Sequence, residues 1–419
     1  MRHHVLHRLL YSAPSRQAAA KHFSTSRCRR RAFREGDVVL LRDKRDTSQD
    51  GMLVKLQAAH SVHSHRGVIN HADLIGKEPR QLVRSSKGTL YRIHEPTLAE
   101  YVRLTPRIVT PIYPADANLI VSQLDIHVDT PSEPLRTEPP LEILEAGTGH
   151  GALTLHLARA VHAANSPRPR PPPIVQQDEP EDAVYLGESM ADLDQTAAAT
   201  WRDNRRAIVH TLDISGTHSK HAKKIVGGFR GGIYSGNVDF HVGDVSEWLS
   251  DQRAKRQTEE PFLSHVLLDL PNADHHLPNV AQALHVNGML AVFNPSITQI
   301  VDCVAAVREQ KMPYLLDKVI ELGAGTIREW DVRAVKPRAS VNKAKVQESV
   351  EGSDGGAVDP VEEQKARDDE LAKDLSQAEE KWATVCRPKA GQQVVGGGFL
   401  GLWRRMEPRS SQETDPSTL

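Results

Sequence analysis

Cysteine and long apolar runs are both scarce in this chain of 419 residues. Its three cysteines, Cys28, Cys303 and Cys386, are too few and too scattered for a disulfide framework or a metal cluster, so we expect no metal site. This scarcity favours an intracellular, reducing compartment. No stretch approaches the run of about 20 apolar residues that a membrane-spanning helix needs, so we expect no span.

Net charge is nearly absent as well, because 53 Lys and Arg face 54 Asp and Glu. Taken alone, this balance argues against a nucleic-acid partner. The balance is an average over unlike segments, however. Between Val38 and Thr110, twelve Lys or Arg stand against seven acids. Phosphate contacts need only such a local basic surface, although charge alone favours a merely solvated face.

Acidic residues are missing from the first 34 residues, which hold nine Lys or Arg among many Ser and Ala. Val5, Leu6, Leu9, Leu10 and Tyr11 could form one apolar stripe of a helix there. An Arg-rich, Ser-rich and acid-free start is typical of a mitochondrial transit peptide. We therefore predict such a peptide over residues 1–35 and location in the mitochondrial matrix. A basic RNA-binding arm or a nuclear signal around Arg29–Arg31, with location in the nucleus, is the alternative.

Hydrophobic patterning divides the remaining chain into two folded parts. Short apolar runs with glycine punctuation predict a small β domain over 36–110. From 111 to 335 strands alternate with helices, which predicts an α/β domain of Rossmann-like type around a parallel sheet. Segments 164–200 and 336–390 are too polar to bury a core, so we expect a mobile insertion and a disordered charged insertion there. The tail 407–419 also reads as disordered.

The strongest motif is a strand over 141–146 that runs into alternating glycines and opens an apolar-periodic helix. Glycines at such a turn allow a nucleoside-type ligand to approach the backbone closely. The acid at the strand end and the lack of a phosphate-binding lysine favour S-adenosylmethionine over a nucleoside triphosphate. A nicotinamide dehydrogenase is disfavoured because Thr154 stands where a third glycine is expected. The candidate cofactor-binding residues of this loop are Glu145, Gly147, Thr148, Gly149 and Gly151.

Three further strands each end in an aspartate. Asp213 ends the strand 208–213 and is placed to accept hydrogen bonds from ribose hydroxyls. Asp244 ends the next strand, where it could contact the adenine amino group of the cofactor; for either residue, capping of the following helix is the alternative. Asp269 follows four apolar residues at the strand end where catalytic groups of open α/β sheets converge. We predict that Asp269 is the catalytic carboxylate, because a carboxylate accepting from an adenine amino group makes the neighbouring ring nitrogen more electron-rich.

With these motifs in order, the chain resembles the tRNA (adenine-N1)-methyltransferase family, whose members modify adenine 58 in the T-loop. Within that family it resembles the catalytic subunit, and specifically a fungal-like mitochondrial member. The resemblance covers most of residues 65–335 and returns in a final strand over 391–406. It includes these motifs: Gly67–His71, Leu74–Lys77, Pro96–Thr97, Thr110–Asp116, Glu145–Gly149, Asn294–Ile300, Arg328–Arg333 and Gly398–Leu400.

The resemblance implies roles for further residues. Asp269 is expected to face the target adenine, with Tyr113 and Phe293 near the base, although Phe293 reads equally well as strand core. Arg328 is a candidate phosphate contact or a surface ion pair. The pair Thr298–Gln299 is expected to cap the next helix, with a role in holding the site loop as the alternative. The family also implies a homotetramer, or a heterotetramer with a non-catalytic paralogue; a mitochondrial presequence favours the homotetramer.

The chain departs from the family pattern at several positions. His150 stands where the family usually has Ser, and we expect its ring to point to solvent. Asp213 replaces the usual Glu, and Asn272–Asp274 replaces a segment with a second Pro and a Trp. These changes leave two alternatives open: a methyltransferase acting on mitochondrial ribosomal or other RNA, and a non-catalytic RNA-binding or assembly factor on the same fold. Retention of the glycine loop and of Asp269 favours an active enzyme.

Overall fold

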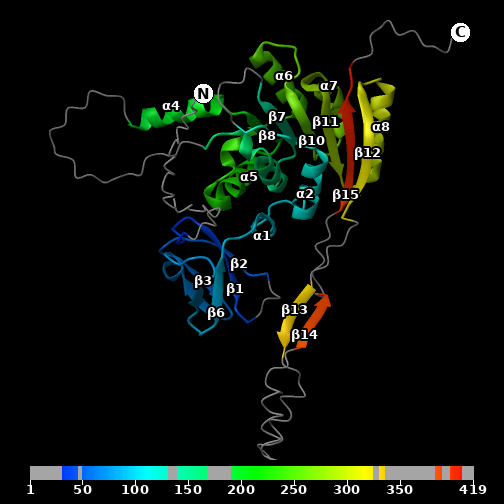
Figure 1. The fold of residues 1–419 in the computed structure, drawn as a ribbon. Helices are drawn as coiled ribbons and strands as arrows, with labels where there is room; N and C mark the ends of the chain where they lie inside the picture. Colours follow the sequence, from blue (N-terminus) through cyan, green and yellow to red (C-terminus); the bar gives the residue numbers. More distant parts are fainter. Residues whose placement is uncertain are drawn as a thin grey trace, which may run out of the picture.

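The computed structural model describes residues 31–45, 50–130, 139–167, 190–323, 330–335, 383–388 and 397–407. Figure 1 shows a small β domain beside a larger α/β domain, with helix α1 between them. The predicted transit peptide up to residue 30, most of both predicted insertions, Arg328 and the tail after residue 407 lie outside the described residues. Among the described helices, none has both the length and the apolar character that crossing a membrane requires.

The small domain is built from antiparallel strands, as its short apolar runs predict. Four strands pair in the order β2-β1-β6-β5, and β3 and β4 form a separate hairpin. Leu41, Leu56, Ile69 and Ile93 lie in its buried core. The strands are β1 (Val38–Asp43), β2 (Met52–Lys55), β3 (Ser61–Ser64), β4 (Gly67–Asn70), β5 (Leu82–Arg84) and β6 (Leu90–His94).

Two helices connect this domain to the larger one. Helix α1 (Leu98–Leu104) begins at Thr97, whose hydroxyl accepts from the Glu100 N–H while Glu100 accepts from the Thr97 N–H, a capping box. Glu100 also forms an ion pair with Arg42 of β1, with 2.6 Å between Nη2 and Oε1. Helix α2 (Pro114–Gln123) follows after a short extended link. The capping carboxylate thereby also ties α1 to the β domain.

The α/β domain is organised around one seven-stranded sheet, in the order β12-β15-β11-β10-β7-β8-β9. All of its strands run parallel except β15, which is antiparallel to both neighbours. The chain leaves β7 towards β8 on one side and returns to β10 on the other. Ligands bind at such a switch point, outside the carboxyl ends of the strands. The strands are β7 (Leu141–Ala146), β8 (Ala207–Asp213), β9 (Val238–Val242), β10 (Leu263–Leu268), β11 (Leu284–Asn294), β12 (Tyr314–Leu322) and β15 (Gly398–Arg405).

Helices cover both faces of this sheet, which confirms the predicted Rossmann-like class. Successive strand residues alternate between two cores: Leu267 packs with α1, α2, α3 and α5, and Leu268 packs with α6, α7 and α8. The helices are α3 (Ala152–Ala160), α5 (Gly216–Gly228), α6 (Val245–Arg256), α7 (Leu277–Ala283) and α8 (Ile297–Glu309). Single 3₁₀ turns are η1 (His71–Asp73), η2 (His162–Ala164), η3 (Phe229–Gly231), η4 (Ser235–Asn237) and η5 (Ala273–His276).

Both predicted insertions contain more regular structure than their composition indicates. Helix α4 (Met190–Asp203) occupies the end of segment 164–200, where buried Trp201 donates from its indole N–H to the Ser166 carbonyl at 3.0 Å. Strand β14 (Ala383–Pro388), inside segment 336–390, pairs antiparallel with β13 (Trp330–Val335). Because the two paired segments lie about 50 residues apart, the sequence carries no local periodicity from which this pairing could be predicted.

Candidate active site

The glycine loop brings the ends of β7 and β10 into contact. Gly147 (φ 97°), Gly149 (φ 49°) and Gly151 (φ 79°) all have left-handed backbone conformations that favour glycine. A Cβ added to Gly147 would lie 2.0 Å from the carbonyl oxygen of Asp269. The two strand ends are also joined by a hydrogen bond, in which the Asp269 N–H donates to the Ala146 carbonyl at 2.8 Å. Only a glycine at 147 therefore allows the predicted catalytic residue to sit against the predicted cofactor loop.

Glu145 lies beneath this loop and is almost wholly buried, with 1% of its surface exposed. Its Oε2 accepts from the hydroxyls of Thr154 on α3 (2.6 Å) and Thr211 on β8 (2.8 Å). Thr211 also bonds to the hydroxyl of Thr148 in the loop, at 2.7 Å. Burial, together with the charges of Asp269 and Asp213, raises the pKa of Glu145 to about 8 against the opposing effect of the two threonine hydrogen bonds. Glu145 thus joins β7, β8, α3 and the loop.

Asp213 holds the loop from the end of β8. Its Oδ2 accepts from the Gly149 N–H at 2.9 Å, and its Oδ1 accepts from the Ser215 N–H at 2.8 Å. His218 Nδ1 lies 3.4 Å from Oδ1. An ionised carboxylate offers about four acceptor positions, so these contacts leave capacity for the ribose hydroxyls that the sequence predicts for this position.

Asp244 caps helix α6, which is the alternative that its position at a strand end left open. Its Oδ1 accepts from the N–H groups of Ser246 (2.7 Å) and Glu247 (3.2 Å). Its Oδ2 takes no part in the cap and lies 3.9 Å from His276 Nε2. Capping fixes the direction of the carboxylate at the carboxyl end of β9, so the cap and a ligand contact through Oδ2 are compatible.

The Asp269 carboxyl lies directly after β10, next to the switch point, and is partly buried. Desolvation, together with the negative charge of Asp213, raises its pKa to about 7. Asp269, Asp213 and Glu145 therefore form an acidic cluster around the glycine loop. A nearby positive charge would stabilise the ionised forms of these groups. The cluster fits S-adenosylmethionine, whose sulfonium carries a positive charge, better than it fits an anionic phosphate ligand.

The residues predicted to meet the substrate lie in different surroundings. Tyr113 is the residue before α2, is partly exposed, and has the guanidinium of Arg107 over its ring at 5.5 Å. Phe293 packs in the core next to Leu400, and a Cβ on Gly398 would lie 2.6 Å from its ring. Phe293 therefore has the packing of a core residue, whereas Tyr113 is accessible.

His150 does not point to solvent, so that expectation was wrong. Only 2% of its surface is exposed. Its Nε2 lies 3.1 Å from the Thr105 hydroxyl, and its Nδ1 lies 3.2 Å from Nε2 of His221 on α5. Burial lowers its pKa to about 4. The left-handed turns at the flanking glycines direct the ring inward, so that His150 connects the glycine loop to the segment after α1 and to α5.

Helix α8 begins as expected, with a different residue as its cap. The Ser296 hydroxyl, rather than Thr298 or Gln299, accepts from the Thr298 N–H at 3.3 Å. The hydroxyls of Ser296 and Thr298 are also 2.8 Å apart.

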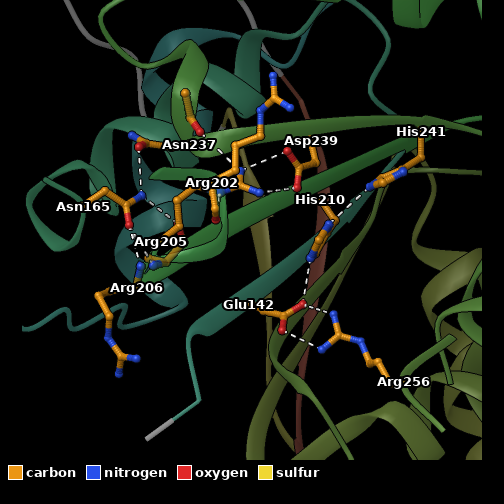
Figure 2. Close-up of polar contacts among 12 residues, drawn as sticks. Glu142, Asn165, Arg202, Arg205, Arg206, His210, Asn237, Asp239, His241 and Arg256 are labelled. Carbon is orange, nitrogen blue, oxygen red and sulfur yellow. Dashed lines mark hydrogen bonds and ion pairs between the residues drawn. The ribbon is translucent and has the colours of Figure 1, made fainter. Parts of the chain in front are cut away.

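Figure 2 shows a second cluster of titratable groups, towards the amino ends of β7, β8 and β9. Both carboxylate oxygens of Glu142 accept from Arg256 of α6, at 2.9 and 2.6 Å, and Oε2 also bonds to His210 at 2.8 Å. Arg205 makes a two-fold contact with Asp239 in the same view. The Glu142 and Asp239 carboxylates are thus both ion-paired, and this cluster lies at the opposite end of the strands from the glycine loop. It therefore joins strands and helix rather than forming a second site.

Comparison with known protein families agrees with both domains. Residues 32–83 match the profile of the TrmI-like N-terminal domain, and residues 205–402 match that of the tRNA methyltransferase complex GCD14 subunit. Both matches are to tRNA methyltransferase families, so the chain is similar to them in its small β domain and in most of its α/β domain. A member from Thermus thermophilus, tRNA (adenine(58)-N(1))-methyltransferase TrmI, is 29% identical over 295 residues, which are 70% of this chain and 88% of the relative.

A second member of the family and one solved structure extend the comparison. The Methanocaldococcus jannaschii tRNA (adenine(57)-N(1)/adenine(58)-N(1))-methyltransferase is 23% identical over 58% of this chain and 72% of its own length. The crystal structure of an S-adenosylmethionine-dependent O-methyltransferase from Thermotoga maritima superposes with a TM-score of 0.54 at 17% identity, covering 91% of this chain and 97% of that one. This superposition supports the fold.

Proposed function

We propose that this chain is an S-adenosylmethionine-dependent methyltransferase that methylates N1 of adenine 58 in the T-loop of tRNA. The observation that carries the proposal is the partly buried Asp269 carboxyl, held against the glycine loop at the switch point of the sheet. The similarity to these families and the activity named for its relatives supply the substrate and the position.

The residues around the loop have different roles, some in binding the cofactor and one in contacting the target base. Glu145, Asp213 and the glycine loop would hold the cofactor, with Asp244 Oδ2 free of the helix cap. S-adenosylmethionine supplies an electrophilic methyl group on a sulfonium. Asp269, when ionised, accepts a hydrogen bond from the adenine 6-amino group, which increases electron density on N1. With the cofactor bound, N1 would take the methyl group from the sulfonium sulfur, which would leave as the thioether, and the Asp269 carboxylate would face the positive charge that develops on the base.

The test is mass spectrometry of nucleosides from unmodified tRNA transcript incubated with the purified chain and S-adenosylmethionine. We expect 1-methyladenosine at position 58 with the wild type, and no product with Asp269→Asn, which keeps the shape but cannot ionise. The same transcript with adenine 58 replaced by guanine is the substrate control. Cofactor binding by both proteins without any methylated adenine would contradict the proposal.

We also propose that the enzyme assembles as a homotetramer rather than a heterotetramer with a non-catalytic paralogue. Strand β12 forms an edge of the sheet and leaves Leu315 (56% exposed) and Val319 (41% exposed) open, and Val301 of α8 is 57% exposed. Exposed apolar clusters of this kind favour a protein contact. Light scattering should give four times the chain mass, and Leu315→Glu/Val319→Glu should lower that mass; a monomeric wild type would contradict this proposal.

The composition of residues 1–35 supports mitochondrial import as the third element of the proposal. We expect residues 1–35 to carry a fluorescent reporter into mitochondria. A variant with Arg29, Arg30 and Arg31 replaced by Gln serves as the comparison. Nuclear accumulation of the reporter that depends on these three residues would favour the alternative.

A further inference from the structure

Helix α5 presents an uncompensated positive face. No Asp or Glu occurs between residues 214 and 238. Lys220, Lys223 and Lys224 are all exposed, and no ion pair among the described residues involves them. Spacings of three and four residues place Lys220 beside Lys223 and Lys224 on one side of the helix, and like charges at these spacings destabilise a helix. A face that breaks this local rule is expected to have a functional reason.

The basic face lies next to the cofactor loop. Ala222 on the opposite side of α5 packs against Gly151, where an added Cβ would lie 3.0 Å from the alanine Cβ. His221 bonds to His150 of the loop, and the charge of Lys224 contributes to lowering the pKa of His221. The charge of Arg107 likewise lowers the pKa of His150. Arg107 is exposed and stacks over Tyr113, so positive charge continues from α5 to the predicted base-contacting residue.

The other end of α5 reaches the β domain. The turn η3, directly after α5, packs against β1, and Tyr101 of α1 donates to the Ile225 carbonyl of α5 at 2.8 Å. Exposed Arg230 lies in this turn. Exposed Lys55 of β2 pairs in register with Val38 of β1, which packs against the same core as Phe229. In Figure 1, α5 lies on the side of the sheet that faces the β domain.

We propose that Lys220, Lys223 and Lys224 bind the phosphate backbone of the tRNA substrate and direct it from the β domain to the active site. This inference rests on the proposed function. The occupant is a polyanion of regular charge spacing, because the cations follow one helix face and continue through Arg230 after the helix and Arg107 beside the loop that contacts it. Surface lysines bind phosphates as point charges, so they contribute affinity without selecting a sequence.

The test compares three variants of the full chain. Lys220→Gln/Lys223→Gln/Lys224→Gln removes the charges, and the corresponding Lys→Arg triple keeps them. Lys255→Gln/Arg308→Gln/Lys311→Gln removes three exposed charges, from α6, α8 and the turn after α8, as the matched control. Affinity for an unmodified tRNA transcript is measured by fluorescence anisotropy over a range of NaCl concentrations, methylation is measured separately, and calorimetry with S-adenosylmethionine checks the cofactor site.

We expect the α5 Gln triple to raise Kd and KM for tRNA at least tenfold, with kcat and cofactor affinity unchanged. The slope of log K for tRNA binding against log salt concentration is negative, and its magnitude should decrease by about two, since each lost phosphate contact reduces that magnitude by about 0.7–0.9. The Arg triple and the control triple should bind as the wild type does. An α5 Gln triple that binds tRNA with wild-type affinity and slope would overturn the inference and leave the proposed function intact. A wild type that binds tRNA through α5 without methylating it would overturn the proposed function alone.

Discussion

At the scale of single residues, the protonation of Asp269 sets the pH dependence. Its pKa is raised to about 7 by burial, with the charge of Asp213 adding to the effect. The ionised form is the acceptor that the chemistry needs, so we expect kcat/KM to rise about tenfold per pH unit below 7 and to level off above it. Cofactor binding brings a positive charge, which should move the midpoint of the kcat profile to lower pH. Asp269→Asn should be inactive throughout. Rates that do not vary between pH 5.5 and 8 would contradict this role.

Gly147 is the residue at which a single added carbon should have the largest effect. Its Cβ would lie 2.0 Å from the Asp269 carbonyl oxygen, at a φ of 97° that other residues rarely adopt. We expect Gly147→Ala to reduce kcat and cofactor affinity by at least tenfold, because the loop and the end of β10 must separate. Gly227→Ala, on α5 with no atom within 4 Å of the added Cβ, is the control and should retain activity.

The positions of several candidate site residues were predictable from the sequence because each lies at the end of a strand or directly after one. Asp213, Asp269 and the glycine loop are of this kind, and the parallel sheet brings them together. The inward direction of His150 was not predictable, since its partners Thr105 and His221 lie 45 and 71 positions away. The surroundings of such a residue depend on tertiary packing, which no local pattern records.

At the scale of elements, the Glu142 cluster joins α6 to β7 and β8. Burial raises the pKa of Glu142, but hydrogen bonds from His210 and Arg256 outweigh it, and the net pKa is lowered. Arg256→Met leaves a buried carboxylate with one partner fewer, so we expect a loss of about 3 kcal/mol in unfolding free energy by urea titration. Glu142→Gln/Arg256→Met should lose less than Arg256→Met alone. A double variant that is less stable than the single would show that the charges do not interact.

The order of elements was predictable to the extent that periodicity is local. Alternating strands and helices between β7 and α8 carry their own patterns, and both faces of the sheet are apolar. The register of β15 between β11 and β12 was not predictable from the motif Gly398–Leu400 alone. Neither was β14, which pairs with a strand on the far side of a polar segment.

At the scale of the whole molecule, buried and partly buried histidines should make the fold sensitive to acid. His94, His150, His156, His241 and His265 each have a pKa lowered to about 4, in every case chiefly by burial. Unfolded chains protonate these groups near pH 6.5, so stability is fully present above that pH and is lost as pH falls towards 4. Glu145 and Asp269 have raised pKa values, so their contribution to folding stability increases as the pH falls.

The unfolded chain should therefore bind more protons than the folded chain between pH 4.5 and 6, by about three. Urea midpoints measured across this range should fall as pH falls. A midpoint that is constant, or that rises towards pH 4.5, would contradict the balance of these groups.

The position of β15 also constrains how the chain is made. In the sheet order β12-β15-β11, the edge strand β12 is joined to the sheet only through β15. Residues 398–405 leave the ribosome more than 70 residues after β12, so β12 has no partner strand until that intervening segment has been synthesised. A chain that stops before Gly398 would therefore lose the pairing of two strands rather than one.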